Sequence, residues 1–137
     1  SKETIDAVIY EAHRLGIYAY VDMMNVPEPK EILKPLKDNP DVIILHRNVD
    51  SGMGKEGQAE DARWKLIKQI KSEVSDKILC AVAGGINPKT AKQALINGAD
   101  ILIVGRYIAQ SKDIERASRE FLALLGEDTD LYRTHVE

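Results

Sequence analysis

Four short apolar segments alternate with helix-like segments along this chain of 137 residues. The apolar segments cover residues 17–22, 42–45, 78–83 and 101–104, and three of them are apolar without interruption. Continuous rather than alternating apolar strands are typical of parallel sheets that are buried on both faces. The stretches between them are long enough for the helical crossovers that parallel strands require. The order predicts an α/β fold of four βα units, preceded by a helix over about 4–15.

Capping signals set the expected helix ends. Asn87 followed by Pro88 is typical of a helix start, because the Asn side chain caps the first turn and Pro fits its first position. Pro35 should end or kink the short helix near residues 32–36. Further helices are expected over about 61–74 and from near Ser111 to Gly126, by the helical spacing of their apolar residues.

Two architectures suit four βα units. One is a small doubly wound sheet, and the other is half of a (β/α)8 TIM-type barrel, whose full form needs about 250 residues. The chain opens with a helix that no strand precedes, which favours the barrel half. We therefore expect residues 1–126 to form a half-barrel with the fifth to eighth strands of a parent barrel, and residues 127–137 to form a C-terminal tail.

A half-barrel would expose the large side chains that its strands aim at the barrel interior. About ten such groups at ~2 kcal/mol each would cost on the order of 20 kcal/mol. Whole domains are stable by only about 5–15 kcal/mol. The sequence therefore predicts that the open side is covered, either by a second copy in a homodimer or by the missing N-terminal half.

Charge and composition exclude several functional classes. With 22 acidic and 19 basic residues the net charge is −3, which argues against nucleic acid as a partner. Neither a membrane-length apolar run nor a secretory leader pattern occurs. The single cysteine, Cys80, excludes an intrachain disulfide and a thiolate metal cage. We expect a cytoplasmic protein without a membrane partner.

Glycine motifs follow the last two predicted strands. Gly84 and Gly85 end the third strand, and Gly105 and Arg106 end the fourth. Barrels commonly bind phosphate at the loops after their last two strands. Glycine lets backbone N–H groups approach an oxyanion, and arginine adds a charge-assisted contact. The two motifs in series predict a phosphate site, although tight turns and a surface arginine would give the same pattern.

Two polar residues end the other strands. His46 follows the second strand directly, where it could move protons near neutral pH or hold its own loop. Asp22 ends the first strand and is either a polar site group or a residue that orients the next turn. The glycine-containing loop 47–61 could close over a ligand or simply be flexible. No cluster of residues with metal-ligand spacing stands out.

These strand ends carry a family resemblance. The four segments are Val21-Asp22-Met23-Met24-Asn25-Val26, Leu45-His46-Arg47-Asn48-Val49-Asp50, Ala81-Val82-Ala83-Gly84-Gly85-Ile86 and Ile103-Val104-Gly105-Arg106. In this order and spacing they resemble the C-terminal half of 3-hexulose-6-phosphate synthase, particularly the archaeal form fused to a formaldehyde-activating domain. That family belongs to the orotidine 5′-monophosphate decarboxylase superfamily of (β/α)8 barrels. The resemblance covers about residues 1–125.

The resemblance implies a reaction and roles for residues. The family adds formaldehyde to ribulose 5-phosphate, or runs the reverse cleavage, with Mg²⁺ stabilising an enediolate. Gly84, Gly85, Gly105 and Arg106 would hold the substrate phosphate, and His46 would shuttle protons. Related 3-keto-L-gulonate-6-phosphate decarboxylases carry an arginine where this chain has Val49, which favours the synthase over a decarboxylase fragment.

The chain departs from the family pattern in one large respect. The Asp-x-Lys-x-x-Asp motif and the acidic residues of the first strands, which supply the Mg²⁺ ligands and the catalytic lysine, have no counterpart in it. We therefore expect a half-enzyme that is inactive or nearly so alone. One alternative is a non-catalytic, self-associating half-barrel that binds sugar phosphates. Another is a stand-alone, receiver-like doubly wound domain.

Overall fold

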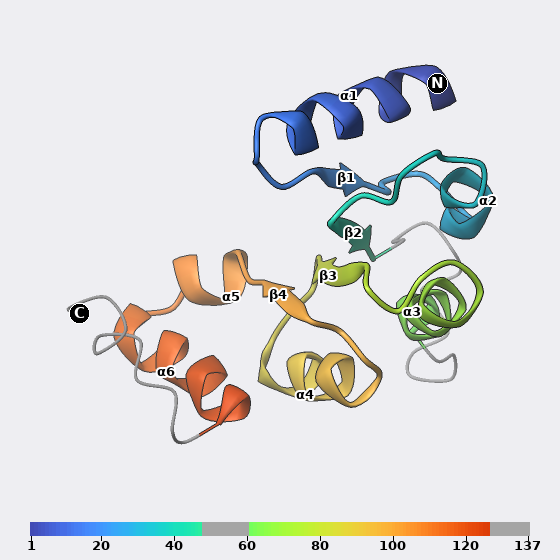
Figure 1. Cartoon of the computed structure of the whole chain (residues 1–137). Helices are drawn as coiled ribbons and strands as arrows, with labels where there is room; N and C mark the ends of the chain where they lie inside the picture. Colours follow the sequence, from blue (N-terminus) through green and yellow to red (C-terminus); the bar gives the residue numbers. More distant parts are fainter. Residues whose placement is uncertain (48–60, 127–137) are drawn as a thin grey trace.

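The computed structural model describes residues 1–47 and 61–126. Their elements alternate in the predicted order (Figure 1), with these bounds: α1 Lys2–Arg14, β1 Tyr20–Asp22, α2 Pro29–Leu33, β2 Val42–His46, α3 Ala62–Glu73, β3 Leu79–Ala83, α4 Pro88–Ile96, β4 Ile101–Ile103, α5 Arg106–Ala109 and α6 Ile114–Leu125. Within these ranges, no helix has the length and apolar character needed to cross a membrane.

The strands form one parallel sheet whose spatial order is the chain order, β1-β2-β3-β4. A doubly wound sheet reverses its strand order at a switch point, whereas a barrel adds each strand beside the last. Figure 1 shows the strands following one another in an arc, with helices α1 to α4 outside it. The half-barrel prediction is confirmed, and the receiver-like alternative is wrong.

One face of the sheet carries the core. Register partners in parallel strands share a face, so Ile43 lies beside Cys80, and Leu45 lies beside Val82, toward the helices. All four are at most 2% exposed. They join a single cluster with side chains from α2, α3, α4 and α6, whose members include Leu33, Trp64, Ile67, Ile70, Ala91, Ala94 and Phe121. Burial raises the pKa of the Cys80 thiol to about 11, so it is a packed, unreactive group.

The opposite face of the sheet is open. Tyr20, Leu79 and Ile103 point to this side, because they alternate along their strands with the core residues. Their exposed fractions are 56%, 43% and 40%. In a closed barrel this face would form the packed interior. The structure therefore leaves part of this surface uncovered, although Val42 and Ala81 on the same face are 2% and 0% exposed.

Most helix ends match the capping signals. Asn87 caps α4 in a capping box: its side chain accepts from the N–H of Thr90, and the Thr90 hydroxyl accepts from the N–H of Asn87. The short helix α2 ends at Leu33, before Pro35. The short helix α5 was not predicted, because its four residues carry no periodic signal. The first strand begins at Tyr20 rather than at residue 17.

Candidate functional site at the strand ends

The residues singled out from the sequence gather at one edge of the sheet. Because all strands are parallel, Asp22, His46, Gly84 and Gly105 each follow or end a strand at the same carboxyl edge. The register places His46 beside Ala83, so the histidine neighbours the glycine turn directly. Ligands of parallel α/β folds bind at this edge. The strand order thus brings the predicted proton-transfer and phosphate residues to neighbouring strand ends.

Asp22 and His46 form a pair across β1 and β2. The Nε2 atom of His46 lies 2.8 Å from Oδ1 and 3.0 Å from Oδ2 of Asp22. The backbone N–H of Met24 donates to Oδ1 of Asp22 at 2.8 Å, which holds the carboxylate. Both side chains lie on the open face, and the histidine side chain is 25% exposed. An acceptor at Nε2 places the proton of the neutral ring there and leaves Nδ1 as the free base.

The Gly84–Gly85 turn needs glycine at both positions. Their φ angles are +88° and +66°, in the left-handed region that side chains rarely adopt. A Cβ on Gly85 would also lie 2.8 Å from Nη1 of Arg47, whose side chain crosses the turn. Arg47 further donates its backbone N–H to Ala83 O at 3.2 Å. The turn is therefore close-packed against the end of β2, and its exposed surface is backbone.

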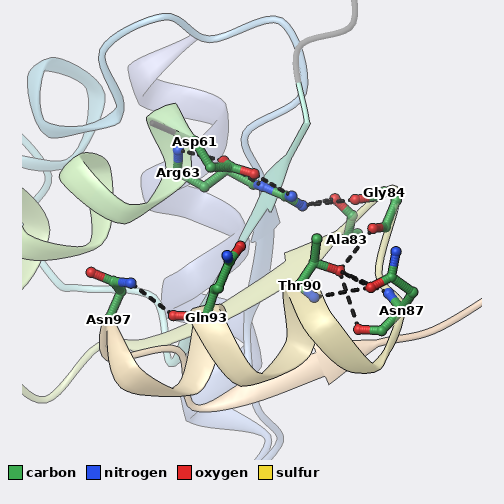
Figure 2. A network of polar contacts seen from close by, with 9 residues as sticks. Asp61, Arg63, Ala83, Gly84, Asn87, Thr90, Gln93 and Asn97 are labelled. Atoms are coloured by element: carbon green, nitrogen blue, oxygen red, sulfur yellow. Dashed lines mark hydrogen bonds and ion pairs between the residues drawn. The ribbon is translucent and has the colours of Figure 1, made fainter. Parts of the chain in front are cut away.

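A buried arginine supports the same turn from behind. Arg63, in the first turn of α3, is 2% exposed and pairs with the N-cap residue Asp61 through Nε and Nη2, at 3.0 and 2.7 Å. Its Nη1 donates to the carbonyls of Ala83 and Gly84 (Figure 2). This contact could not be predicted from the local sequence, because an arginine near a helix start is typical of an exposed position. The sequence feature that could have indicated the contact is an N-cap aspartate at the start of α3 followed two residues later by an arginine.

The second motif predicted to bind phosphate has a different geometry. Gly105 has φ −111°, so its backbone does not require glycine, and a Cβ there would meet no atom within 4 Å. Arg106 begins α5 and is exposed, and within the described ranges its side chain makes no hydrogen bond or ion pair. The open space at Gly105 fits the approach of a ligand to the backbone. Gly105 and Arg106 lie at the end of β4, the strand adjacent to the Gly84–Gly85 turn.

The donor set does not fit a divalent cation. In residues 1–47 and 61–126, no three His, Cys, Asp or Glu side chains converge as a metal site. Asp22 and His46 offer two donors, and Mg²⁺ takes near-octahedral oxygen ligation. Asp22 and His46 therefore do not by themselves make a Mg²⁺ site. Residues 48–60, which include Val49 and most of the loop predicted over 47–61, lie outside the described residues. The predicted tail 127–137 lies outside them too.

Asp61 ionises more readily than an ordinary aspartate. Burial alone would raise its pKa, but the hydrogen bonds and charge of Arg63 outweigh burial, so the pKa lies below its usual value. A folded-state pKa below the unfolded value stabilises the protein above the unfolded pKa, and this stability is lost as the pH falls through the folded pKa.

We therefore expect the Asp61→Asn variant to lose less stability than the wild type on acidification. Asparagine keeps the N-cap but does not titrate. Urea unfolding at pH 6 and pH 3 measures this, and the gap between the two proteins should be larger at pH 6. A constant gap at both pH values would show that the charge of Asp61 contributes nothing.

Comparison with known proteins places this edge in a family context. Residues 1–121 match the orotidine 5′-phosphate decarboxylase / HUMPS family. A curated relative from Methanosphaera stadtmanae, described as a bifunctional enzyme Fae/Hps, is 42% identical over 100% of this chain and 34% of its own length. A protein of the same description from Methanosarcina barkeri is 44% identical over 98% of the chain and 33% of its own length. The chain thus spans about a third of these relatives.

Solved structures agree with this fold. The chain is similar to 3-hexulose-6-phosphate synthase from Salmonella typhimurium, with a TM-score of 0.70 and 26% identity over 91% of this chain and 57% of that one. A second 3-hexulose-6-phosphate synthase structure superposes with a TM-score of 0.67 at 18% identity, which bears on the fold alone. The sequence resemblance is confirmed, and the chain belongs to the orotidine 5′-phosphate decarboxylase / HUMPS family.

Proposed function

We propose that this chain is the C-terminal, phosphate-binding half of a 3-hexulose-6-phosphate synthase barrel. In this role it supplies His46 for proton transfer, with Asp22 as its partner, and Gly84, Gly85, Gly105 and Arg106 for the substrate phosphate. The complementary half supplies the Mg²⁺ ligands and the lysine of the family. The chain alone is inactive, or nearly so, in the aldol addition of formaldehyde to ribulose 5-phosphate and in the reverse cleavage.

One observation carries this proposal: the proton-transfer pair and both glycine motifs occupy adjacent carboxyl ends of one sequentially ordered parallel sheet. Its support outside the geometry is the similarity of the chain to proteins described as Fae/Hps and as 3-hexulose-6-phosphate synthase. A phosphate held at the ends of β3 and β4 would extend its sugar along the edge toward β2 and β1, where His46 and Asp22 lie.

His46 can move the proton that the aldol reaction requires. Forming the enediolate of ribulose 5-phosphate removes a proton from carbon next to the carbonyl, and the reverse cleavage returns one. With Nε2 held against Asp22, Nδ1 of the neutral ring accepts that proton, and the carboxylate stabilises the imidazolium that results. Asp22 acts through the histidine and is a positioning residue in this scheme.

Phosphate recognition combines backbone amides with one cation. The turn at Gly84 and Gly85 exposes backbone, and the open space at Gly105 admits an oxyanion close to the chain. Arg106 adds a planar guanidinium, which binds phosphate oxygens in a bidentate manner. In this scheme the two glycine motifs bind the substrate phosphate, while the Asp22–His46 pair at β1 and β2 transfers the proton.

A second candidate function is binding without catalysis. The observation that favours it is the lack of a three-ligand metal cluster among residues 1–47 and 61–126. A half-barrel covered by a second copy would keep two phosphate edges and no complete catalytic site. The two functions share the phosphate site and differ in turnover once the complementary half is present.

The phosphate site is tested by titrating the chain with ribulose 5-phosphate while recording amide NMR spectra. The amide signals of Gly84, Gly85 and Gly105 should shift in a saturable manner. Replacing Arg106 with alanine should weaken binding about 10- to 100-fold, because a charge-assisted contact contributes about 1.5–3 kcal/mol.

Arg119→Ala is the matched control for that titration. Arg119 is an exposed arginine on α6 paired with Glu115, so its loss changes the net charge equally without touching the strand ends. Its variant should bind as the wild type does. Unshifted glycine amides in the wild type, or equal weakening by both variants, would contradict a phosphate site at this edge.

A further inference from the structure

We propose that Arg63 is a positioning residue that holds the Gly84–Gly85 turn so that the amide of Gly85 faces the substrate phosphate. This inference rests on the proposed phosphate site and adds to it a buried group that does not touch the ligand. Arg63 acts through the peptide groups of the turn: it binds their carbonyl oxygens on one side, and their N–H groups are thereby presented on the other.

The contacts of Arg63 are unusually complete for a side chain that is 98% buried, since only 2% of it is exposed. Asp61 binds Nε and Nη2, which fixes the plane of the guanidinium. The remaining nitrogen, Nη1, donates to Ala83 O at 2.6 Å and to Gly84 O at 2.9 Å. In Figure 2 the guanidinium reaches from the α3 side to the turn, with Asp61 behind it. Two consecutive carbonyls therefore face one nitrogen.

The geometry of the peptide bond fixes the direction in which the amide N–H groups of the turn point. In a planar trans peptide the N–H points opposite to the C=O, and no cis peptide occurs in the described chain. Ala83 O also accepts from the backbone N–H of Arg47 at the end of β2, so this carbonyl faces the β2 side. The N–H of Gly84 then faces β4, where Ile103 is the register partner of Ala83. The N–H of Gly85, opposite the second carbonyl held by Nη1, also points away from Arg63.

The amide of Gly85 is not consumed by the sheet. The hydrogen-bond ladder continues past β1, where Met23 N–H donates to Ile44 O, and past β2, where Arg47 N–H donates to Ala83 O. Past β3, the register pair Ala83↔Ile103 directs the Gly84 N–H toward the Ile103 carbonyl of β4. The Gly85 N–H lies beyond the last register pair, and over residues 1–47 and 61–126 it donates to no backbone acceptor. Backbone donors at an exposed turn without a protein acceptor are available to an oxyanion.

A third carbonyl is held from the other side of the turn. The Thr90 hydroxyl, at the start of α4, donates to Gly85 O at 3.0 Å (Figure 2). Ala83, Gly84 and Gly85 thus all have their carbonyls bound by side chains from two helices. These contacts restrict rotation of the turn's backbone. Glycine at both positions, each with a positive φ angle, would otherwise leave this backbone free to rotate.

The charge of Arg63 adds to its geometric effect. A cation bound to a carbonyl polarises the peptide group, and hydrogen bonds in such chains strengthen one another in a low-dielectric surrounding. Burying a guanidinium is costly and weak evidence for stability alone. Its placement behind the candidate phosphate turn gives this buried ion pair a function in binding.

The test is a titration of the full chain with inorganic phosphate, read by amide NMR, in the wild type, Arg63→Gln and Arg63→Lys. Losing the orienting contacts should weaken phosphate binding about tenfold in Arg63→Gln, the equivalent of one to two hydrogen bonds. Lysine keeps the charge but lacks the fork that binds Asp61 and both carbonyls at once, so Arg63→Lys should bind with intermediate affinity. The bound-state shifts of Gly84 and Gly85 should shrink, while that of Gly105 persists.

Lys71→Met is the matched control. Lys71 lies on the same helix α3 and donates to Ile78 O and Asp100, at the opposite end of β3. Its loss should lower the unfolding midpoint without changing phosphate affinity. If the Arg63→Gln variant does not fold, the phosphate affinity of the Arg63→Lys variant decides the test.

The outcomes separate the two proposals. If phosphate does not shift the amide signals of Gly84, Gly85 and Gly105 in the wild type, the proposed phosphate site is wrong, and the positioning role is wrong with it. A wild type that binds, beside Arg63 variants that bind equally well with unchanged Gly84 and Gly85 shifts, overturns the positioning role alone. Weakening by Lys71→Met to the same extent as by Arg63→Lys would reduce the effect to general stability and also overturn it.

Discussion

Replacing His46 with glutamine is expected to lower the rate of formaldehyde addition to ribulose 5-phosphate about 10²- to 10⁴-fold, the usual contribution of a general base. The measurement uses a barrel completed by a separately expressed N-terminal half of a 3-hexulose-6-phosphate synthase. Glutamine fills the space of the imidazole and can keep a hydrogen bond to Asp22, but it cannot accept a proton. Binding of ribulose 5-phosphate should change little, because the proposed phosphate site lies on the neighbouring strands.

The control for this variant is His13→Gln. His13 also pairs with an aspartate, with Nε2 at 2.8 Å from Oδ2 of Asp41, but it lies on α1 and the pair lies at the other end of the sheet. Its variant should retain the wild-type rate. A His46→Gln enzyme that turns over at the wild-type rate would remove the histidine from the chemistry and leave it a structural role.

The open face of the sheet should make the chain associate. Tyr20, Leu79 and Ile103 are large apolar side chains on the side that a closed barrel buries. Burying such a side chain contributes about 1.5–3 kcal/mol, so a covered face is strongly favoured. We expect the isolated chain to have a solution mass twice the 15.3 kDa of one copy, measured by light scattering after size exclusion.

A charge on the open face should disrupt that association. Leu79→Lys would bring an ammonium group into a buried interface, and this variant should run as a monomer. Ile96→Lys is the matched control, because Ile96 is 74% exposed on the outer helix α4 and faces away from the sheet. A wild-type monomer, or a dimer that survives Leu79→Lys, would contradict association through the open face.

Much of the fold was predictable because its signals are local. Uninterrupted apolar runs marked the buried strands, and Asn87-Pro88 marked a helix start. Placing His46 and the glycines at one edge required only that the strands be parallel, which the helix-length connections imply. The sequential strand order, which decides between barrel half and doubly wound sheet, depends on tertiary packing. It appeared only in the structure.

The missing parts of the site were those that depend on three-dimensional contact. The Asp22–His46 pair joins residues from two strands, and its geometry depends on the register. Arg63 contacts Ala83 across 20 positions of sequence, and an arginine in a helix carries no local sign of burial. Likewise, Arg47 was quoted within a motif, but its position over the glycine turn became clear only from the folded chain.

The central claim is that this chain holds the phosphate and proton-transfer edge of a synthase barrel and needs the other half to act. The most direct measurement is formaldehyde-dependent consumption of ribulose 5-phosphate by the wild-type chain, alone and with the complementary N-terminal half. We predict no turnover by the chain alone and clear turnover by the reconstituted barrel. Turnover by the chain alone, or a folded stoichiometric complex without activity, would contradict the account.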